Sequence, residues 1–121
     1  MSNARELLEL AAKAAGYEFQ YGEKHTIMGE GIVCDFSGIM YVDCGLPDHF
    51  MTEWNPLTDD GDALRLAVKL EINILPSMEE CSARNPGYSA SWHNELATTD
   101  PYAATRRAIV RAAAEMGRAM P

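Results

Sequence analysis

The last helical segment of the sequence carries the residues best suited to bind a charged ligand. At about 100° per residue on a helical wheel, three arginines form one basic stripe, namely Arg107, Arg111 and Arg118. Arg106 falls instead in the apolar sector, between Tyr102 and Val110. A guanidinium that faces a core needs a partner. We therefore expect Arg106 to meet either a carboxylate, from Asp35 or Asp43, or an anionic ligand.

Aromatic residues offer a second kind of ligand contact, because tyrosine and tryptophan rings stack on nucleotide bases. Trp54 begins the run Trp54-Asn55-Pro56, which is typical of a loop, so its indole either folds back onto the core or contacts a partner. For each aromatic ring, core packing is the alternative. For the arginines, the alternatives are a solvated helix face and a structural ion pair. The candidate ligand-binding residues are Arg106, Arg107, Tyr102, Trp54 and Trp92.

Cysteine and histidine spacing predicts no metal site. Cys34, Cys44 and Cys81 are too far apart in the sequence for the C-x₂₋₄-C spacing of zinc sites. In a hairpin that turns at Ser37-Gly38, Cys34 pairs with Tyr41 and Cys44 points to the opposite face, so the two cannot share an ion or a disulfide. We expect free thiols, no metal and no cofactor.

Acidic and catalytic motifs are equally sparse. Three aspartates between residues 59 and 62 lack the ligand order of a calcium loop, and helix capping accounts for them. The sequence contains no nucleophile elbow, phosphate-binding glycine loop or zinc-protease motif. We expect a non-catalytic protein, and the alternative is a small hydrolase that uses His49 or His93 and acts on a nucleotide-type substrate.

Length and charge restrict the class of protein. The chain has 121 residues and a net charge of −8, and residues 1–121 are expected to form a single domain. The negative charge argues against binding to nucleic acid or to anionic membranes. The first residues form an amphipathic pattern without the apolar block of a signal peptide, so we expect a cytoplasmic protein.

Hydrophobic periodicity predicts an α+β fold. Three helices are expected, at 3–15, 58–70 and 100–117, with Asp59 or Thr58 and Asp100 as N-caps and Gly16 ending the first helix. Strands are expected at 17–20, 32–36, 39–44, 72–75 and 88–93, with irregular structure at 45–58 and 76–87. The order α-β-β-β-α-β-β-α predicts an antiparallel sheet of four to five strands covered by three helices in a sandwich-like arrangement.

Three stretches of the chain resemble small bacteriophage and prophage proteins. They are Trp54-Asn55-Pro56-Leu57-Thr58-Asp59-Asp60-Gly61-Asp62-Ala63-Leu64, Ile72-Asn73-Ile74, and Asp100-Pro101-Tyr102-Ala103-Ala104-Thr105-Arg106-Arg107-Ala108. The chain is similar in these stretches to the NinX-like proteins and the phage alpha-beta-alpha sandwich family. The shared motifs are structural, and residues 22–50 and 76–99 depart most from the family pattern.

The resemblance implies a phage accessory protein that acts in the host cytosol. Small proteins of this kind act against host defences, either by sequestering a nucleotide immune signal or by blocking a host defence protein. We therefore expect a homo-oligomeric binding protein whose partner is a nucleotide-type small molecule or a basic host protein. A structural or regulatory phage protein without a small ligand is a further alternative.

Overall fold

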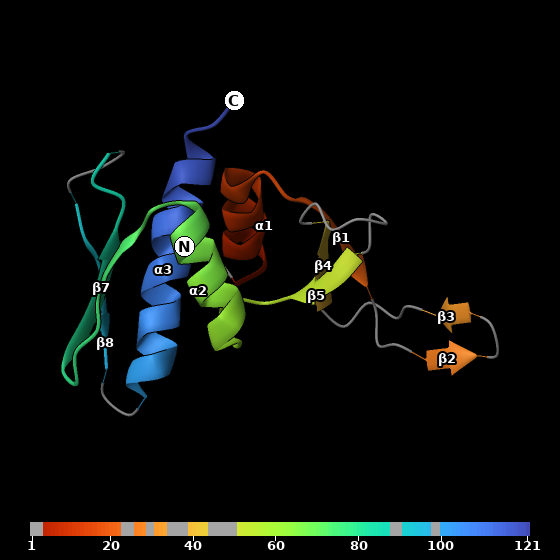
Figure 1. Ribbon diagram of the computed structural model, residues 1–121, viewed down its shortest axis with the longest axis horizontal. Coiled ribbons are helices and arrows are strands. Elements are labelled where there is room, and N and C mark those ends of the chain that lie inside the picture. The colour runs from red at the N-terminus through yellow and green to blue at the C-terminus, as the bar shows by residue number, and fades with distance from the viewer. Residues whose placement is uncertain are drawn as a thin grey trace.

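The computed structural model describes residues 4–22, 26–28, 31–33, 39–43, 51–87, 91–97 and 100–121. In these residues five short strands lie between the first and second helices and three between the second and third (Figure 1). The helices are α1 (Ala4–Ala15), α2 (Asp60–Lys69) and α3 (Pro101–Arg118). The strands are β1 (Glu18–Gly22), β2 (Thr26–Met28), β3 (Gly31–Val33), β4 (Ile39–Asp43), β5 (Met51–Trp54), β6 (Asn73–Leu75), β7 (Glu80–Arg84) and β8 (His93–Leu96). The α+β class and the three expected helices are confirmed.

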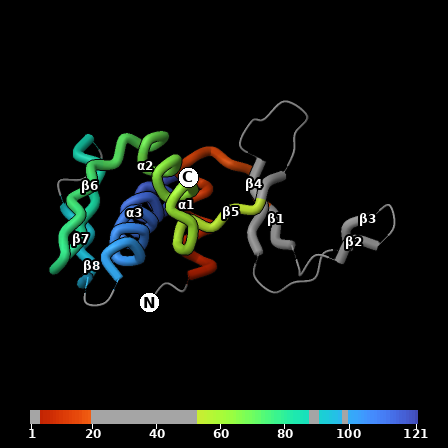
Figure 2. The backbone as a smooth tube through the Cα atoms, turned by 60° about the horizontal axis from the view of Figure 1, so that its bottom comes forward, coloured from red at the N-terminus to blue at the C-terminus, as the bar shows by residue number. Residues whose placement is uncertain are grey.

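All of the described strand pairs are antiparallel, as expected, and they form three separate ladders. One sheet has the order β1-β4-β5, a second consists of β2 and β3, and a third has the order β6-β7-β8. The third sheet packs against α3, which lies between this sheet and α1 (Figures 1 and 2).

The hairpin expected between residues 32–36 and 39–44 is wrong. β3 pairs with β2, whereas β4 pairs with β1 on one edge and with β5 on the other, so that Gln20 and not Cys34 lies opposite Tyr41. Ladders on both edges satisfy the backbone groups of β4 more completely than one short hairpin does. The Ser37-Gly38 turn itself, Cys34 and Cys44 lie outside the described residues.

The ends of the helices follow the capping residues of the sequence. Asp59 caps α2, where its side chain accepts a hydrogen bond from the backbone N–H of Asp62 at 2.8 Å. Asp100 caps α3 in the same way, and Pro101 occupies the first turn. Gly16 follows α1 with φ +76°, a conformation that glycine adopts at little cost.

Two segments expected to be irregular contain strands. β5 lies within 45–58, and β7 lies within 76–87 as the central strand of the third sheet. β7 is built from small and polar residues, which gave no alternation in the sequence, but Cys81, Ser82 and Ala83 are buried. Ser82 Oγ donates a hydrogen bond to Asn94 Oδ1 of β8 at 2.6 Å, so that its hydroxyl is satisfied inside the sheet. The strand expected at 88–93 begins later, at His93, and residues 88–90 lie outside the described part.

Small side chains build the contact between α1 and α3. The buried residues of α1 are Leu8, Ala11, Ala12 and Ala15, and those of α3 are Ala104, Ala108, Ile109, Val110, Ala112, Ala113, Ala114 and Gly117. Alanine and glycine allow two helix backbones to approach closely, and Gly117 faces the backbone carbonyl of Leu10. Beyond this point Lys13 Nζ donates a hydrogen bond to the carbonyl of Met120 at 2.9 Å. Among the described residues, none of the helices is long and apolar enough to cross a membrane.

Gly117→Ala tests this helix contact. A Cβ built at Gly117 would lie 2.0 Å from the carbonyl oxygen of Leu10, so the two helices must separate to accommodate it. We expect the free energy of unfolding, measured by urea denaturation, to fall by about 1–3 kcal/mol or more.

Gly61→Ala is the matched control for this substitution. A Cβ at Gly61 meets the end of the Arg65 side chain at 3.1 Å and the capping oxygen Asp59 Oδ2 at 3.2 Å, and a shift of a few tenths of an ångström in these two side chains accommodates it. The control should change the free energy of unfolding by well under about 1 kcal/mol. Equal effects of the two substitutions would contradict a tight contact at Gly117.

Candidate functional site

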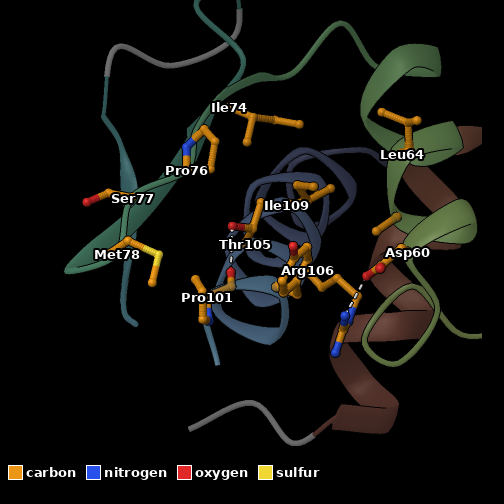
Figure 3. A pocket seen from close by; sticks show the side chains of 12 residues that line it. Asp60, Leu64, Ile74, Pro76, Ser77, Met78, Pro101, Thr105, Arg106 and Ile109 are labelled. Atoms are coloured by element: carbon orange, nitrogen blue, oxygen red, sulfur yellow. Dashed lines mark hydrogen bonds and ion pairs between the residues drawn. The ribbon is translucent and has the colours of Figure 1, made fainter. Parts of the chain in front are cut away.

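An apolar groove of about 680 Å³ opens between α2, α3 and the segment that joins β6 to β7 (Figure 3). Its lining residues are Asp60, Ala63, Leu64, Ile74, Pro76, Ser77, Met78, Pro101, Tyr102, Thr105, Arg106 and Ile109. Two of the residues expected to bind a ligand, Arg106 and Tyr102, are therefore brought together in one groove.

The walls of the groove present large apolar side chains to solvent. Leu64 of α2, Met78 after β6 and Tyr102 of α3 are all exposed, Tyr102 to 69%. The hydroxyl of Thr105 adds little polarity, since it donates a hydrogen bond to the carbonyl of Pro101 at 2.8 Å within the helix (Figure 3). Exposed apolar side chains that gather in one hollow are typical of a binding surface.

Arg106 is held by two partners, one at the start of α2 and one in the segment just before it. Its Nε donates a hydrogen bond to the carbonyl of Leu57 at 2.9 Å, and its Nη1 lies 2.5 Å from Asp60 Oδ1. The arginine side chain is 15% exposed, whereas the aspartate is 68% exposed. The expectation that Arg106 pairs with a carboxylate or an anionic ligand is met by Asp60, which was not one of the two carboxylates expected; Asp35 and the side chain of Asp43 lie outside the described part of the structure. Asp60 takes this place because α2 packs on α3, an arrangement that the sequence does not reveal.

The surroundings of the groove are acidic. Asp60 belongs to the lining, and the exposed residues Glu79 and Asp100 directly adjoin the lining residues Met78 and Pro101 in the sequence. Arg106 is the single cationic residue among the lining residues that the structure describes, and Asp60 offsets its charge. The groove therefore combines an apolar floor with one lining carboxylate and two exposed acidic residues next to its lining in the sequence.

A second hollow of about 650 Å³, which we name the arginine hollow, lies between α1, α3 and β8. It is lined by Ala4, Leu7, Leu57, His93, Glu95, Arg107, Arg111, Glu115 and Arg118. The basic stripe expected on the last helix therefore faces one hollow. It is not simply a solvated face, because all three arginines form ion pairs with glutamates.

Glu95 bridges two of these arginines. Its Oε1 lies 3.0 Å from Arg107 Nε, and its Oε2 accepts a hydrogen bond from Arg111 Nη1. Arg111 Nη1 also donates to the carbonyl of Asn94 at 3.0 Å, and Arg118 pairs with Glu115 at 3.2 Å. The bridge joins β8 to α3 and fixes two guanidinium groups side by side.

His93 lies in the same hollow with a pKa below the ordinary value of 6.5. Burial is the largest cause of the lowered pKa and the positive charge of Arg111 the second, while Glu115 and Glu95 act in the opposite direction. His93 is therefore mainly neutral near pH 7. His93 is one of the two histidines named for the hydrolase alternative, and the other, His49, lies outside the described residues.

The two expected tryptophans line neither hollow. Trp54 is buried in the core, where its ring makes an edge-to-face contact with Tyr17 at a centroid distance of 5.9 Å. Trp92 is half-buried beneath the guanidinium of Arg84, 4.4 Å from the ring centroid. Of the two alternatives for Trp54, the indole folds back onto the core.

Sequence reasoning missed several residues of the two hollows, among them Leu64, Met78 and Glu95. Leu64 lies outside the buried stripe of α2. An apolar residue in that position was the one sequence feature that could have indicated an exposed binding surface. Nothing in the sequence marked Met78 or Glu95, since the elements that place them were unknown. Within the described part of the chain, no three histidine, cysteine or acidic side chains gather as metal ligands.

No family model matches the chain, and neither a curated protein nor a solved structure matches it. The resemblance to phage proteins therefore stays a prediction.

Arg106→Ala tests how the groove is held together. The substitution leaves the Leu57 carbonyl without its donor, and we expect the free energy of unfolding in urea to fall by about 1–3 kcal/mol. Asp60→Asn is the control, because exposed ion pairs contribute about 1 kcal/mol or less. If the control destabilises the protein as much as Arg106→Ala, the carboxylate and not the Leu57 carbonyl is the main partner of Arg106.

The pKa of His93 is open to measurement by an NMR titration of its imidazole, assigned by comparison with His93→Gln. We expect a pKa below 6.5, and Arg111→Ala should raise this pKa because it removes a positive neighbour.

The lowered pKa of His93 also has a consequence for stability. The unfolded chain takes up the proton more readily than the folded one, so stability is lost as the pH falls through 6.5 toward the folded pKa. Between about pH 7.5 and about pH 5.5, acidification should therefore destabilise the wild type more than His93→Gln. Identical losses in the two proteins would contradict this linkage.

Proposed function

We propose that this protein is a non-catalytic binding protein whose apolar groove takes a basic, amphipathic segment of a partner protein. The observation that carries the proposal is the groove itself, an open apolar hollow with acidic residues around it. The proposal corresponds to the protein-partner version of the function expected from the sequence.

The apolar part of the argument rests on three exposed side chains, Leu64, Met78 and Tyr102. Exposed apolar surface is unfavourable in water, at about 25 cal/mol per Å². A partner segment that covers these side chains removes their apolar surface from water and so stabilises the complex. The volume of about 680 Å³ is that of an ordinary ligand site and accommodates the anchoring side chains of a peptide.

Charge selects the kind of segment. The chain carries a net charge of −8, Asp60 lines the groove, and Glu79 and Asp100 adjoin lining residues in the sequence. Lysine or arginine residues on either side of apolar anchors would meet these carboxylates and speed association. A nucleotide is a poorer occupant of this groove, because its phosphates would meet the acidic surroundings while Arg106 is already paired with Asp60.

In the setting that the phage resemblance implies, the partner is a host defence protein, and occupancy of its basic segment blocks it. Sequence resemblance supports this setting, and the groove supports the chemistry of the contact. A partner that presents a basic segment also agrees with the repulsion that the negative charge exerts on nucleic acid and membranes.

Selection from a random peptide library displayed on yeast tests the proposal directly. We expect the enriched peptides to combine apolar anchors with lysine or arginine. Met78→Ser should weaken binding of a synthetic enriched peptide about tenfold, which corresponds to about 1.4 kcal/mol, because an apolar wall is lost. Fluorescence anisotropy measures the dissociation constant.

Leu96→Ser is the matched control, because Leu96 is a similarly exposed apolar residue that does not line the groove. Binding should also weaken as salt is added, since charge attraction is screened. Enrichment of acidic peptides, or equal losses for the two serine variants, would overturn the proposed groove.

A further inference from the structure

The arginine hollow reverses the charge of the molecule locally. Three arginines and two glutamates line it, so its formal charge is positive on a chain whose net charge is −8. The lowered pKa of His93 keeps that residue neutral near pH 7, and His93 therefore does not alter this balance. A local positive site on an acidic protein attracts a small anion more readily than a large acidic surface, which the rest of the molecule repels.

The donors of two arginines are incompletely used. Arg107 donates through Nε to Glu95, and Arg111 donates through Nη1 to Glu95 and Asn94. Among the described residues, the two terminal nitrogens of Arg107 and Nη2 of Arg111 have no hydrogen-bond partner. A guanidinium presents its donors in a flat fork that matches two oxygens of a phosphate.

Glu95 holds the side chains that carry these donors in place. Each of its oxygens is occupied by one arginine, and the carboxylate is 19% exposed. Glu95 therefore acts as a positioning residue that holds two guanidinium groups next to each other on one side of α3. The side chains of Arg107 and Arg111 are 44% and 42% exposed, so their outer nitrogens can be reached from solvent.

Apolar residues complete the hollow. Ala4 and Leu7 of α1 and Leu57 belong to its lining, beside the charged side chains of α3 and β8. A bare inorganic ion would leave this apolar surface unused, whereas an organic group attached to the anion would cover it. The volume of about 650 Å³ admits such a group.

We propose that the arginine hollow binds the phosphate group of a small organic phosphate, with Arg107 and Arg111 as the phosphate ligands and the organic part against Ala4, Leu7 and Leu57. This site is distinct from the apolar groove, because the two share no lining residue. The proposal therefore stands or falls independently of the peptide-binding function.

Calorimetric titrations with phenyl phosphate, inorganic phosphate and benzoate test the proposal. Phenyl phosphate should bind most tightly, because it offers both the phosphate and an apolar ring. Inorganic phosphate and benzoate should each bind at least about tenfold more weakly, since each lacks one of these parts. NMR signals of the Nε–Hε groups of Arg107 and Arg111 should shift with phenyl phosphate.

Arg107→Ala should weaken phenyl phosphate binding at least about tenfold. Arg65→Ala is the matched control, because Arg65 is an exposed arginine that pairs with Asp62 on α2 and does not line the hollow. Arg107→Lys keeps the charge without the flat fork, and it should give an intermediate affinity even if the alanine variant folds poorly.

Three results would overturn the site. They are the absence of phenyl phosphate binding by the wild type, benzoate binding as tightly as phenyl phosphate, and equal losses for Arg107→Ala and Arg65→Ala. The second result would identify a general anion site in place of a phosphate site. A Met78→Ser protein that still binds phenyl phosphate would show that the groove and the hollow are separate.

Discussion

The close approach of α1 and α3 is the constraint on which the rest of the structure depends. Gly117 faces the carbonyl of Leu10, and alanines fill most of the remaining contact. Small residues give each contact little buried area, so the stability of this pair depends on the helices lying close enough for many weak contacts to form at once. A single added methyl group therefore has a larger effect here than in a core of leucines. The contact between α1 and α3 therefore determines where the side chains of α3 lie.

The rotation of α3 about its own axis decides what each hollow contains. Arg106 and Arg107 are neighbours in the sequence but point about 100° apart on a helix, and they belong to different hollows. Arg106 joins the apolar groove, where Asp60 of α2 supplies its carboxylate and Leu57, before α2, its carbonyl. Arg107 faces β8 and the bridging Glu95. One helix thus separates an acidic, apolar surface from a basic one, and the two surfaces favour partners of opposite charge.

The sequence predicted the helices and the inward position of Arg106, because caps and the 3.6-residue period are local properties. Asp59, Asp100 and Gly16 mark helix ends through their own backbone and side-chain geometry. The central strand β7 was missed because its burial is imposed by α3 and not by its own side chains. The partner of Arg106 and the bridge through Glu95 were missed for the same reason. Both contacts depend on which helices and strands pack together, and the local sequence pattern does not contain that information.

The pairing of the first described helix with the last one also affects how the chain folds during synthesis. Ribosomes add about 5–20 residues per second, so α1 emerges several seconds before the helix that covers it. During that interval the apolar face around Leu8 and Ala11 has no native partner. The contact between α1 and α3 therefore closes only after α3 has been made. The apolar faces of α1 and α3 are therefore covered in the same step.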